Sequence, residues 1–180
     1  MKPEYIENYT ENIFNELLKD LNWISTGAPR DEYFMSENAL EYTYGSGRGE
    51  RTYSSSLFHP LVKELMERMN KEFDCKYDIC FLNYYSGNKN HLGWHADDSP
   101  EMDSEHPIAS VSYGAERSIY WKHKDYKGVI PPDQQQLLGS GSLFVMPKGF
   151  QKDNLHKIPK HSCACVGRIS LTFRHYVNKE

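Results

Sequence analysis

The segment that most restricts the fold is the run Arg168-Ile169-Ser170-Leu171-Thr172-Phe173-Arg174. Its alternation has the period of a β-strand, which places Ile169, Leu171 and Phe173 on one face and Arg168, Ser170, Thr172 and Arg174 on the other. Because the apolar face needs a core, we expect the strand to lie inside a sheet. Its arginines would then be buried with an anionic partner such as a small dicarboxylate. The alternative is an edge strand whose arginines reach solvent.

Two amphipathic helices are expected in the first part of the chain. The first covers Thr10 to Trp23, with Thr10 as N-cap and apolar residues at helical spacing, namely Ile13, Phe14, Leu17, Leu18 and Leu21. The second begins at Pro60, a residue favoured at the first helical position. Its apolar stripe consists of Leu61, Leu65, Met66, Met69 and Phe73, which we interpret as core.

Short strands dominate the remainder. After residue 78 we predict strands over Ile79–Tyr85, Ile108–Tyr113, Ser118–Trp121, Ser142–Met146 and Arg168–Tyr176. Before it, Leu40–Tyr44 alternates like a strand and runs into the glycine-rich segment 45–49, which lacks the Lys-Ser/Thr of a phosphate loop and indicates a hairpin or lid. The fold class is therefore α+β, mainly β: a jelly roll (double-stranded β-helix) backed by N-terminal helices, with an N-terminal β-hairpin lid.

The 180 residues fit one domain. Within it we expect an N-terminal helix and lid (1–57), a supporting helix (58–78) and a catalytic core (79–176).

The formal charge of −4 excludes a globally basic nucleic-acid coat but leaves room for a local basic patch. Mean hydropathy is −0.74 and no apolar run approaches the length of a membrane span, so no membrane association is expected. Four cysteines without framework spacing favour a reduced, cytoplasmic or nuclear setting.

A metal site is suggested by His95-Ala96-Asp97, since residues two apart on a strand share a face. His-x-Asp alone is a weak signal, and a polar loop is its ordinary explanation. With His156 as a third ligand, two histidines and a carboxylate would form the facial triad of non-haem Fe(II) oxygenases. Asn83 and Tyr85 share a parity and could bind the same ligand as the arginines. The triplet His161-x-Cys163-x-Cys165 has the wrong spacing for structural zinc and is interpreted as a loop.

Five motifs occur in order along the chain: Asn83-Tyr84-Tyr85, His95-Ala96-Asp97-Asp98, the run Pro107 to Gly114, His156-Lys157-Ile158-Pro159, and Arg168 with Leu171-Thr172-Phe173-Arg174. Together they resemble the AlkB family of Fe(II)/2-oxoglutarate dioxygenases, closest to its nuclear DNA-repair branch. Pro29-Arg30 and Tyr42-Thr43-Tyr44 also resemble the lid region of that branch. The resemblance covers roughly residues 28–176.

The resemblance implies a ligand set and an activity. It implies His95, Asp97 and His156 as iron ligands and catalytic centre, and the residues around 2-oxoglutarate would be Asn83, Tyr85, Arg168, Thr172 and Arg174. The cofactors would be Fe(II), 2-oxoglutarate and O2. The implied reaction is oxidative demethylation of N-alkylated bases, such as 1-methyladenine or 3-methylcytosine, in DNA or RNA. It releases formaldehyde, succinate and CO2, and the base would be flipped out of its strand.

Residues near the substrate depart from the family pattern. The family often carries an acid two positions after the ligand Asp, where this chain has Ser99 beside Asp98, so base preference is open. Ser170 replaces a usual asparagine, and Ser86-Gly87 replaces Asp-Gly. Tyr42 and Tyr44 could stack a base, although tyrosines on a strand are more often core. Arg48 and Arg51 could contact phosphates.

Charge is unevenly distributed along the chain. Residues 95–106 hold five acids and no lysine or arginine, whereas residues 147–161 hold four lysines against one acid. A short basic rim of this kind suits a few phosphate contacts, and a solvated surface is the alternative. Trp94 either packs in the core or forms a wall of the pocket.

Two rival functions remain: an Fe(II)/2-oxoglutarate hydroxylase acting on a protein, small molecule or other modified base, and a non-catalytic jelly-roll binding module. A monomer is expected.

Overall fold

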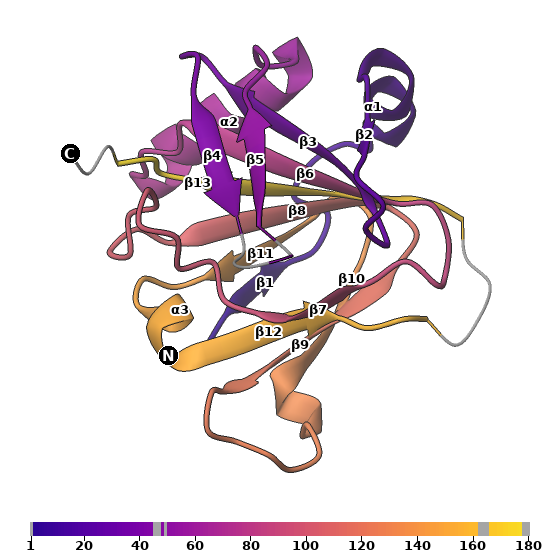
Figure 1. The fold of residues 1–180 in the computed structure, drawn as a ribbon, viewed down its shortest axis with the longest axis vertical. Coiled ribbons are helices and arrows are strands. Elements are labelled where there is room, and N and C mark those ends of the chain that lie inside the picture. Colours follow the sequence, from indigo (N-terminus) through magenta and orange to yellow (C-terminus); the bar gives the residue numbers. More distant parts are fainter. Residues whose placement is uncertain (1, 45–47, 49, 162–165, 178–180) are drawn as a thin grey trace.

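The computed structural model describes residues 2–44, 48, 50–161 and 166–177. Two antiparallel sheets face each other, and a separate hairpin lies beside them (Figure 1). The larger sheet has the spatial order β1 (Glu4–Ile6), β11 (Ser142–Met146), β8 (Ile108–Gly114), β13 (Arg168–Arg174), β6 (Ile79–Tyr85), β3 (Asp31–Ser36) and β2 (Ile24–Ser25). The smaller sheet has the order β10 (Gln135–Leu138), β9 (Arg117–His123), β12 (Asn154–Ile158) and β7 (Leu92–His95).

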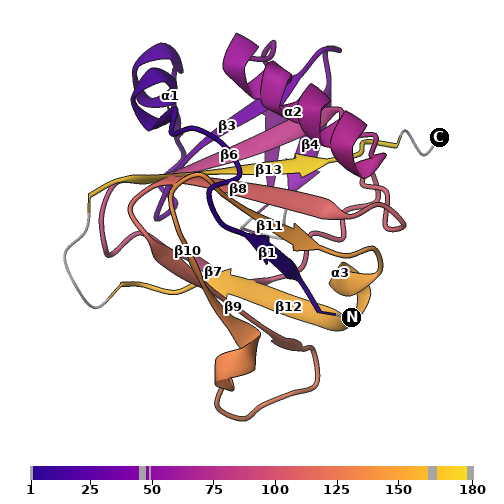
Figure 2. The same cartoon turned by 180° about the vertical axis from the view of Figure 1, so that it is seen from behind.

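Helices cover the larger sheet on the side away from the smaller one, as Figure 2 shows. They are α1 (Phe14–Asp20) and α2 (Pro60–Phe73), and the short α3 (Phe150–Asp153) leads into β12. A 3₁₀ turn, η2 (Pro132–Gln134), precedes β10. The hairpin consists of β4 (Glu41–Tyr44) and β5 (Arg51–Ser54). This arrangement confirms the predicted mainly β jelly roll with N-terminal helices and a hairpin.

The apolar core lies mainly between the helices and the larger sheet. Leu17 of α1 and the inner face of α2 pack against Ile169, Leu171 and Phe173 of β13, none of which has exposed surface. A second cluster fills part of the space between the sheets and includes Ile119, Phe144 and Ile158. None of the helices among the described residues is long and apolar enough to cross a membrane.

Strand β13 lies between β8 and β6, in the middle of the larger sheet. Seven residues pair in register with β6, from Arg168 opposite Tyr85 to Arg174 opposite Ile79. Arg168 is 1% exposed and Arg174 is 6% exposed. The predicted interior strand with inward arginines is therefore confirmed, and the edge-strand alternative is wrong.

The first helix is shorter than predicted. Helix α1 begins at Phe14 with Ile13 at the N-cap, and Thr10 does not cap it. The backbone of Thr10 instead donates to the carbonyl of Gly141 at 3.1 Å, which ties this segment to the sheet. Asn12 accepts from the N–H of Phe14 at 3.0 Å and takes part of the capping role. The chain leaves the helix after Asp20, because Leu21 is extended.

The second helix begins at Pro60 as predicted, and the central residues of its predicted stripe, Leu65, Met66 and Met69, are buried, whereas the two end residues are not. Val62, Leu65, Met66 and Met69 are buried, which is the i, i+3, i+4, i+7 pattern of one helix face. Leu61 and Phe73 are exposed at 36% and 39%, so they border the core instead of filling it. His59 caps the helix by accepting from the N–H of Leu61.

The predicted bounds of the strands Ile79–Tyr85 and Ser142–Met146 were correct. The bounds of the other predicted strands differ from the observed ones by one or two residues at an end. Strand β9 extends the predicted Ser118–Trp121 at both ends, and β13 stops at Arg174. Strands β3, β7, β10 and β12 were not predicted, nor were β1, β2 and β5. Of the glycine-rich segment after β4, only Arg48 lies within the described residues.

We predict that Gly114→Ala weakens folding. Gly114 has φ +89°, and an added Cβ would meet the carbonyl oxygen of Gly167 and, at 2.8 Å, Cδ2 of Phe14. The strained backbone and the overpacking should lower the free energy of unfolding by about 1–3 kcal/mol. Urea unfolding followed by circular dichroism measures this. Gly87→Ala is the control, because its Cβ would meet nothing closer than 3.8 Å and no left-handed φ is involved; equal losses in both variants would contradict the prediction.

Candidate metal centre and its pocket

The three predicted metal ligands meet between the two sheets. His95 ends β7, Asp97 follows two residues later, and His156 lies in β12, where it pairs in register with His95. Their ligand atoms all lie within 4.8 Å of one another. Nε2 of His95 is 3.7 Å and Nε2 of His156 is 3.5 Å from the Asp97 carboxylate. Two imidazoles and one carboxylate on one side of a cavity suit a divalent transition metal with open positions.

Hydrogen bonds outside the cluster orient its members. Nδ1 of His95 lies 2.7 Å from the carbonyl oxygen of Gly93. Since a carbonyl only accepts, Nδ1 carries the proton, and Nε2 is left with its lone pair toward Asp97. The backbone N–H of Asp97 donates to Oε1 of Gln151 at 2.9 Å. Such supporting bonds are the usual means by which proteins fix metal ligands.

The protonation states also suit a cation. Burial alone would raise the pKa of Asp97, but Arg174 and the two histidines hold it well below the ordinary value. Nη2 of Arg174 lies 3.0 Å from Oδ1 of Asp97. Burial, and then the neighbouring His156, lower the pKa of His95 to about 3. The site therefore offers an ionised carboxylate and, at His95, an unprotonated imidazole at neutral pH.

A pocket opens beside these three residues. The side chains predicted to bind 2-oxoglutarate all line it, namely Asn83, Tyr85, Arg168, Thr172 and Arg174. They come from β6 and β13, which are neighbours in the larger sheet, while the metal ligands come from the smaller sheet and the residues after it. The two sheets thus place one half of the site each.

Arg168 shows what kind of ligand the pocket fits. Its Nη2 donates to Oγ of Ser112 at 2.9 Å, whereas Nε and Nη1 are buried without a hydrogen-bond partner in the described structure. Its guanidinium stacks 5.2 Å from the ring centroid of Tyr85. Burial lowers the pKa of Arg168, which reflects the cost of a desolvated cation. A carboxylate in the pocket would satisfy both open donors.

Sequence reasoning gave no role to a buried network next to this pocket. Glu32 has no exposed surface; it contacts Arg30 at 3.1 Å and Arg51 at 3.3 Å and accepts from the hydroxyl of Tyr53. Arg30 in turn donates to Oδ1 of Asn83 at 3.2 Å. The network therefore joins the hairpin strand β5 to the pocket wall. Pro29-Arg30 was noticed only for its resemblance, and nothing in the sequence marked Glu32.

Arg117 was also missed. It is 1% exposed, its guanidinium lies 5.6 Å from the ring centroid of Tyr85, and it donates to the carbonyl oxygens of Asn90 and Pro159 at 2.7 and 2.5 Å. It thus joins the loop before β7 to the loop after β12. Its position at the start of a strand gave no signal of this role.

Tyr42 lies at the metal end of the pocket. Its side chain is 1% exposed and packs against Phe34 and Phe81. Its hydroxyl is 3.0 Å from Oγ of Ser99 and accepts from Nη1 of Arg174 at 3.2 Å. Tyr42 is thus a buried residue of the pocket wall. Ser99 does not line the pocket and is hydrogen-bonded to the Tyr42 hydroxyl. Burial, opposed in part by Arg174, raises its pKa, so it remains a neutral hydroxyl.

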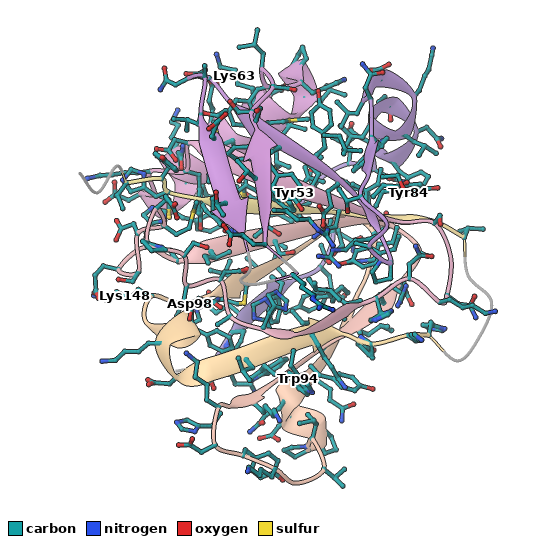
Figure 3. All side chains as sticks on the ribbon, viewed as in Figure 1. Tyr53, Lys63, Tyr84, Trp94, Asp98 and Lys148 are labelled. Carbon is teal, nitrogen blue, oxygen red and sulfur yellow. The ribbon has the colours of Figure 1, made fainter. Side chains whose placement is uncertain are left out.

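Other predicted substrate residues lie elsewhere. Arg51 is engaged with Glu32 and with Oγ1 of Thr26 at 2.8 Å, so the prediction of a phosphate contact there is weakened. Asp98 is exposed and contacts Lys124 at 3.8 Å, outside the residues that line the pocket (Figure 3). Arg48 is exposed.

Two predictions from the sequence, base stacking by Tyr44 and the loop that holds Cys163 and Cys165, concern side chains outside the described part of the structure. Trp94 does not line the pocket: it lies on the other face of β7 from His95. The prediction that it walls the pocket is therefore wrong, and its ring contacts the ammonium groups of Lys122 and Lys157 on the outer face of the smaller sheet.

We predict that the metal-free protein loses stability as the pH falls below 6.5. Between pH 6.5 and about 3 the unfolded chain binds a proton at His95 that the folded chain does not. This group alone should lower the free energy of unfolding by about 1.4 kcal/mol per pH unit in that window. Urea unfolding in chelator at several pH values measures the slope. His95→Gln should make it shallower, and an unchanged slope would contradict the prediction.

Comparisons with known proteins agree with this geometry. The model of the 2OG-Fe(II) oxygenase superfamily matches residues 7–174. The chain is 28% identical to the DNA oxidative demethylase ALKBH2 of Bos taurus, covering 91% of this chain and 63% of that protein. It is 34% identical to the ALKBH2 of Arabidopsis thaliana, covering 81% and 52%. It is 28% identical to the alpha-ketoglutarate-dependent dioxygenase alkB homolog 3 of Bos taurus, covering 91% and 60%.

A solved structure of OsALKBH1 has the same fold, with a TM-score of 0.63, 17% identity, and coverage of 96% of this chain and 97% of that one. The chain spans about half to two thirds of the length of the ALKBH2 and alkB homolog 3 relatives. The family match and the His–Asp–His cluster together support Fe(II), 2-oxoglutarate and O2 as cofactors. The chain therefore belongs to the 2OG-Fe(II) oxygenase superfamily and is an AlkB-type member of it.

Proposed function

We propose that this chain is an Fe(II)/2-oxoglutarate-dependent dioxygenase that oxidatively demethylates N-alkylated bases in DNA or RNA. One observation carries the proposal: His95, Asp97 and His156 converge beside a pocket whose far wall holds Arg168 with two unsatisfied donors. A metal site next to a carboxylate site is the arrangement that the co-substrate requires. The relatives named as DNA oxidative demethylases support the substrate class.

The two arginines of β13 would serve opposite ends of 2-oxoglutarate. Their Cα atoms are about 20 Å apart along the strand, at roughly 3.4 Å per residue, so they do not converge on one carboxylate. Arg174 contacts Asp97 and is therefore at the metal end. Arg168 is at the far end, where its open donors would bind the distal carboxylate in a bidentate manner. On the neighbouring strand β6, Tyr85 pairs with Arg168, and Asn83 pairs with Ser170, which lies between the two arginines.

When bound, Fe(II) with 2-oxoglutarate and O2 supplies the oxidation of the N-methyl group, and the hydroxymethyl product then releases formaldehyde. The residues of the chain hold the reactants and exclude water. His95, Asp97 and His156 would occupy one side of the metal and leave the other open. Tyr42 closes the metal end with a neutral hydroxyl held by Arg174. A base reaching this buried site would have to be flipped out of its strand.

The nature of the base is a narrower question. Asp97 is the one carboxylate among the described residues that line the pocket, and the metal would use it. Ser99 offers a hydroxyl, which is already bonded to Tyr42. The pocket thus holds no spare negative charge for a cationic base such as 1-methyladenine, and neutral methylated bases belong in any substrate panel. A monomer in the cytoplasm or nucleus remains part of the proposal.

The first test is turnover. Oligonucleotides with 1-methyladenine, 3-methylcytosine, 1-methylguanine or 3-methylthymine should be repaired with equal yields of formaldehyde and succinate. His95→Ala and Asp97→Ala should abolish both products and also the visible charge-transfer band of the anaerobic Fe(II)/2-oxoglutarate complex. A band together with succinate, but without loss of methyl from any base, would favour the rival hydroxylase. Absence of the band in the intact protein would favour the non-catalytic binding module.

The second test concerns Arg168. Removing one partner of a buried charged pair costs about 2–5 kcal/mol, so Arg168→Met should raise the KM for 2-oxoglutarate about thirty-fold or more. The same change should leave the metal-free protein as stable or more stable, because it removes an unpaired buried cation. Arg68→Met, on the exposed side of α2, is the matched control. A KM for 2-oxoglutarate unchanged in Arg168→Met would sink the assignment.

A further inference from the structure

The outer face of the smaller sheet carries an aromatic and basic cluster that the pocket does not use. It consists of Trp94 on β7, Lys157 on β12, and Tyr120 and Lys122 on β9; we call it the outer patch. None of these side chains lines the pocket. In Figure 3 the label of Trp94 lies below β12, on the side of the smaller sheet away from the helices.

Aromatic rings and ammonium groups alternate across the strands. Nζ of Lys157 is 4.7 Å from the ring centroid of Trp94 and 5.8 Å from that of Tyr120. Nζ of Lys122 is also 4.7 Å from the Trp94 ring. Lys157 pairs in register with Tyr120, which pairs with Gln135 on β10. The patch therefore spans β7, β12 and β9, three of the four strands of the sheet, and its side chains are partly exposed.

The positive charge of this patch is not neutralised by the protein. In the part of the chain that the structure describes, no ion pair joins Lys122 or Lys157 to a carboxylate. Both ammonium groups lie close to one indole ring, so they also repel each other. Asp98, three residues beyond the end of β7, pairs with Lys124 at 3.8 Å. Two like charges held together without counter-ions suit an anionic partner.

The patch and the pocket are joined by one strand. Trp94 and His95 are consecutive on β7, which is an edge strand of the smaller sheet, and their side chains project to opposite faces. A nucleotide strand that inserts a base toward His95 can therefore pass over this edge and continue across the outer face. Tyr120 and the lysines follow Trp94 in the same direction across β12 and β9.

We propose that the outer patch binds the single-stranded nucleic acid that flanks the base in the pocket. Trp94 and Tyr120 would stack on bases, and Lys122 and Lys157 would contact phosphates, which is how proteins bind single strands without reading sequence. The assignment of partner rests on the proposed function of the pocket. The lysines and rings would thereby add affinity for a strand and leave the reaction itself unchanged.

The test is direct binding, which needs no turnover. Fluorescence anisotropy with an unmodified oligothymidylate of roughly fifteen nucleotides should show weaker binding by Lys122→Gln/Lys157→Gln, by about tenfold at low salt. The slope of log affinity against log salt should become shallower by about 1.4, or 0.7 for each lost phosphate contact on a single strand. The matched control is Lys19→Gln/Lys71→Gln, which removes the same charge from the exposed ends of α1 and α2.

Tryptophan fluorescence tests the stacking. Binding should quench the fluorescence of the wild type, and Trp94→Phe should remove the quench while retaining affinity. The other two tryptophans lie away from the patch, since Trp121 is buried at 8% exposure and Trp23 packs against Tyr33 and Tyr84 of the larger sheet. Equal affinity and salt slope in the two lysine double variants would overturn the proposal. So would polyglutamate that competes with the oligonucleotide at equal charge concentration, because the patch would then be a general polyanion site.

Turnover then separates the two proposals. If the pocket demethylates bases, the lysine double variant should keep wild-type kcat/KM on a methylated trinucleotide, which is too short to cross the sheet, and lose it on the longer strand. Equal losses on both substrates would contradict a role in strand binding. If no methylated base is turned over but the oligothymidylate binds through the patch, the function of the pocket fails and the patch stands.

Discussion

The structure depends on burying two guanidinium groups on the central strand of its larger sheet. Arg168 and Arg174 lie on the face of β13 that looks toward the smaller sheet, while the opposite face is apolar and holds the helices. A cation in such a place is tolerated only with partners. Arg174 has Asp97, and Arg168 has Ser112 and the ring of Tyr85. What remains unsatisfied on Arg168 is therefore a requirement for a ligand, built into the sheet.

The same reasoning extends to the other buried charges. Among the residues that the structure describes, the buried arginines are Arg30, Arg117, Arg168 and Arg174, whereas the buried acids are Glu32 and Asp97. Glu32 balances Arg30 and binds Arg51 from the hairpin. Arg117 is held by backbone carbonyl oxygens. The interior thus holds more positive than negative charge, and a metal would add to it, so an anionic co-substrate completes the balance. Glu32 also links the hairpin strand β5, through Arg30, to Asn83 in the wall of the pocket.

The sequence allowed the parts of the site with strong local patterns to be predicted. Alternation along β13 predicted its interior position and its inward arginines. His-x-Asp with a distant histidine was a weak signal for the metal cluster, and the family resemblance was needed to predict the ligand set. Local patterns did not reveal long-range polar contacts. Glu32 looks like an ordinary strand residue in the sequence, and only the fold brings Arg30 and two residues of β5, Arg51 and Tyr53, to its carboxylate. Thr10 looks like a helix cap in the sequence, but in the fold its backbone N–H donates to the carbonyl of Gly141. Short strands such as β7 and β12 carry too few residues for alternation to be recognised.

Strand β7 shows how a short edge strand can serve two surfaces. Its inward residue, His95, belongs to the metal cluster, and the residue before it, Trp94, faces solvent between two lysines. A net charge of −4 therefore describes the molecule poorly, because acids gather in residues 97–105 while the outer patch is basic. A polyanion approaching this chain would be repelled from the loop after β7 and attracted to the outer face of the smaller sheet. That asymmetry gives a bound strand one direction along which to leave the pocket.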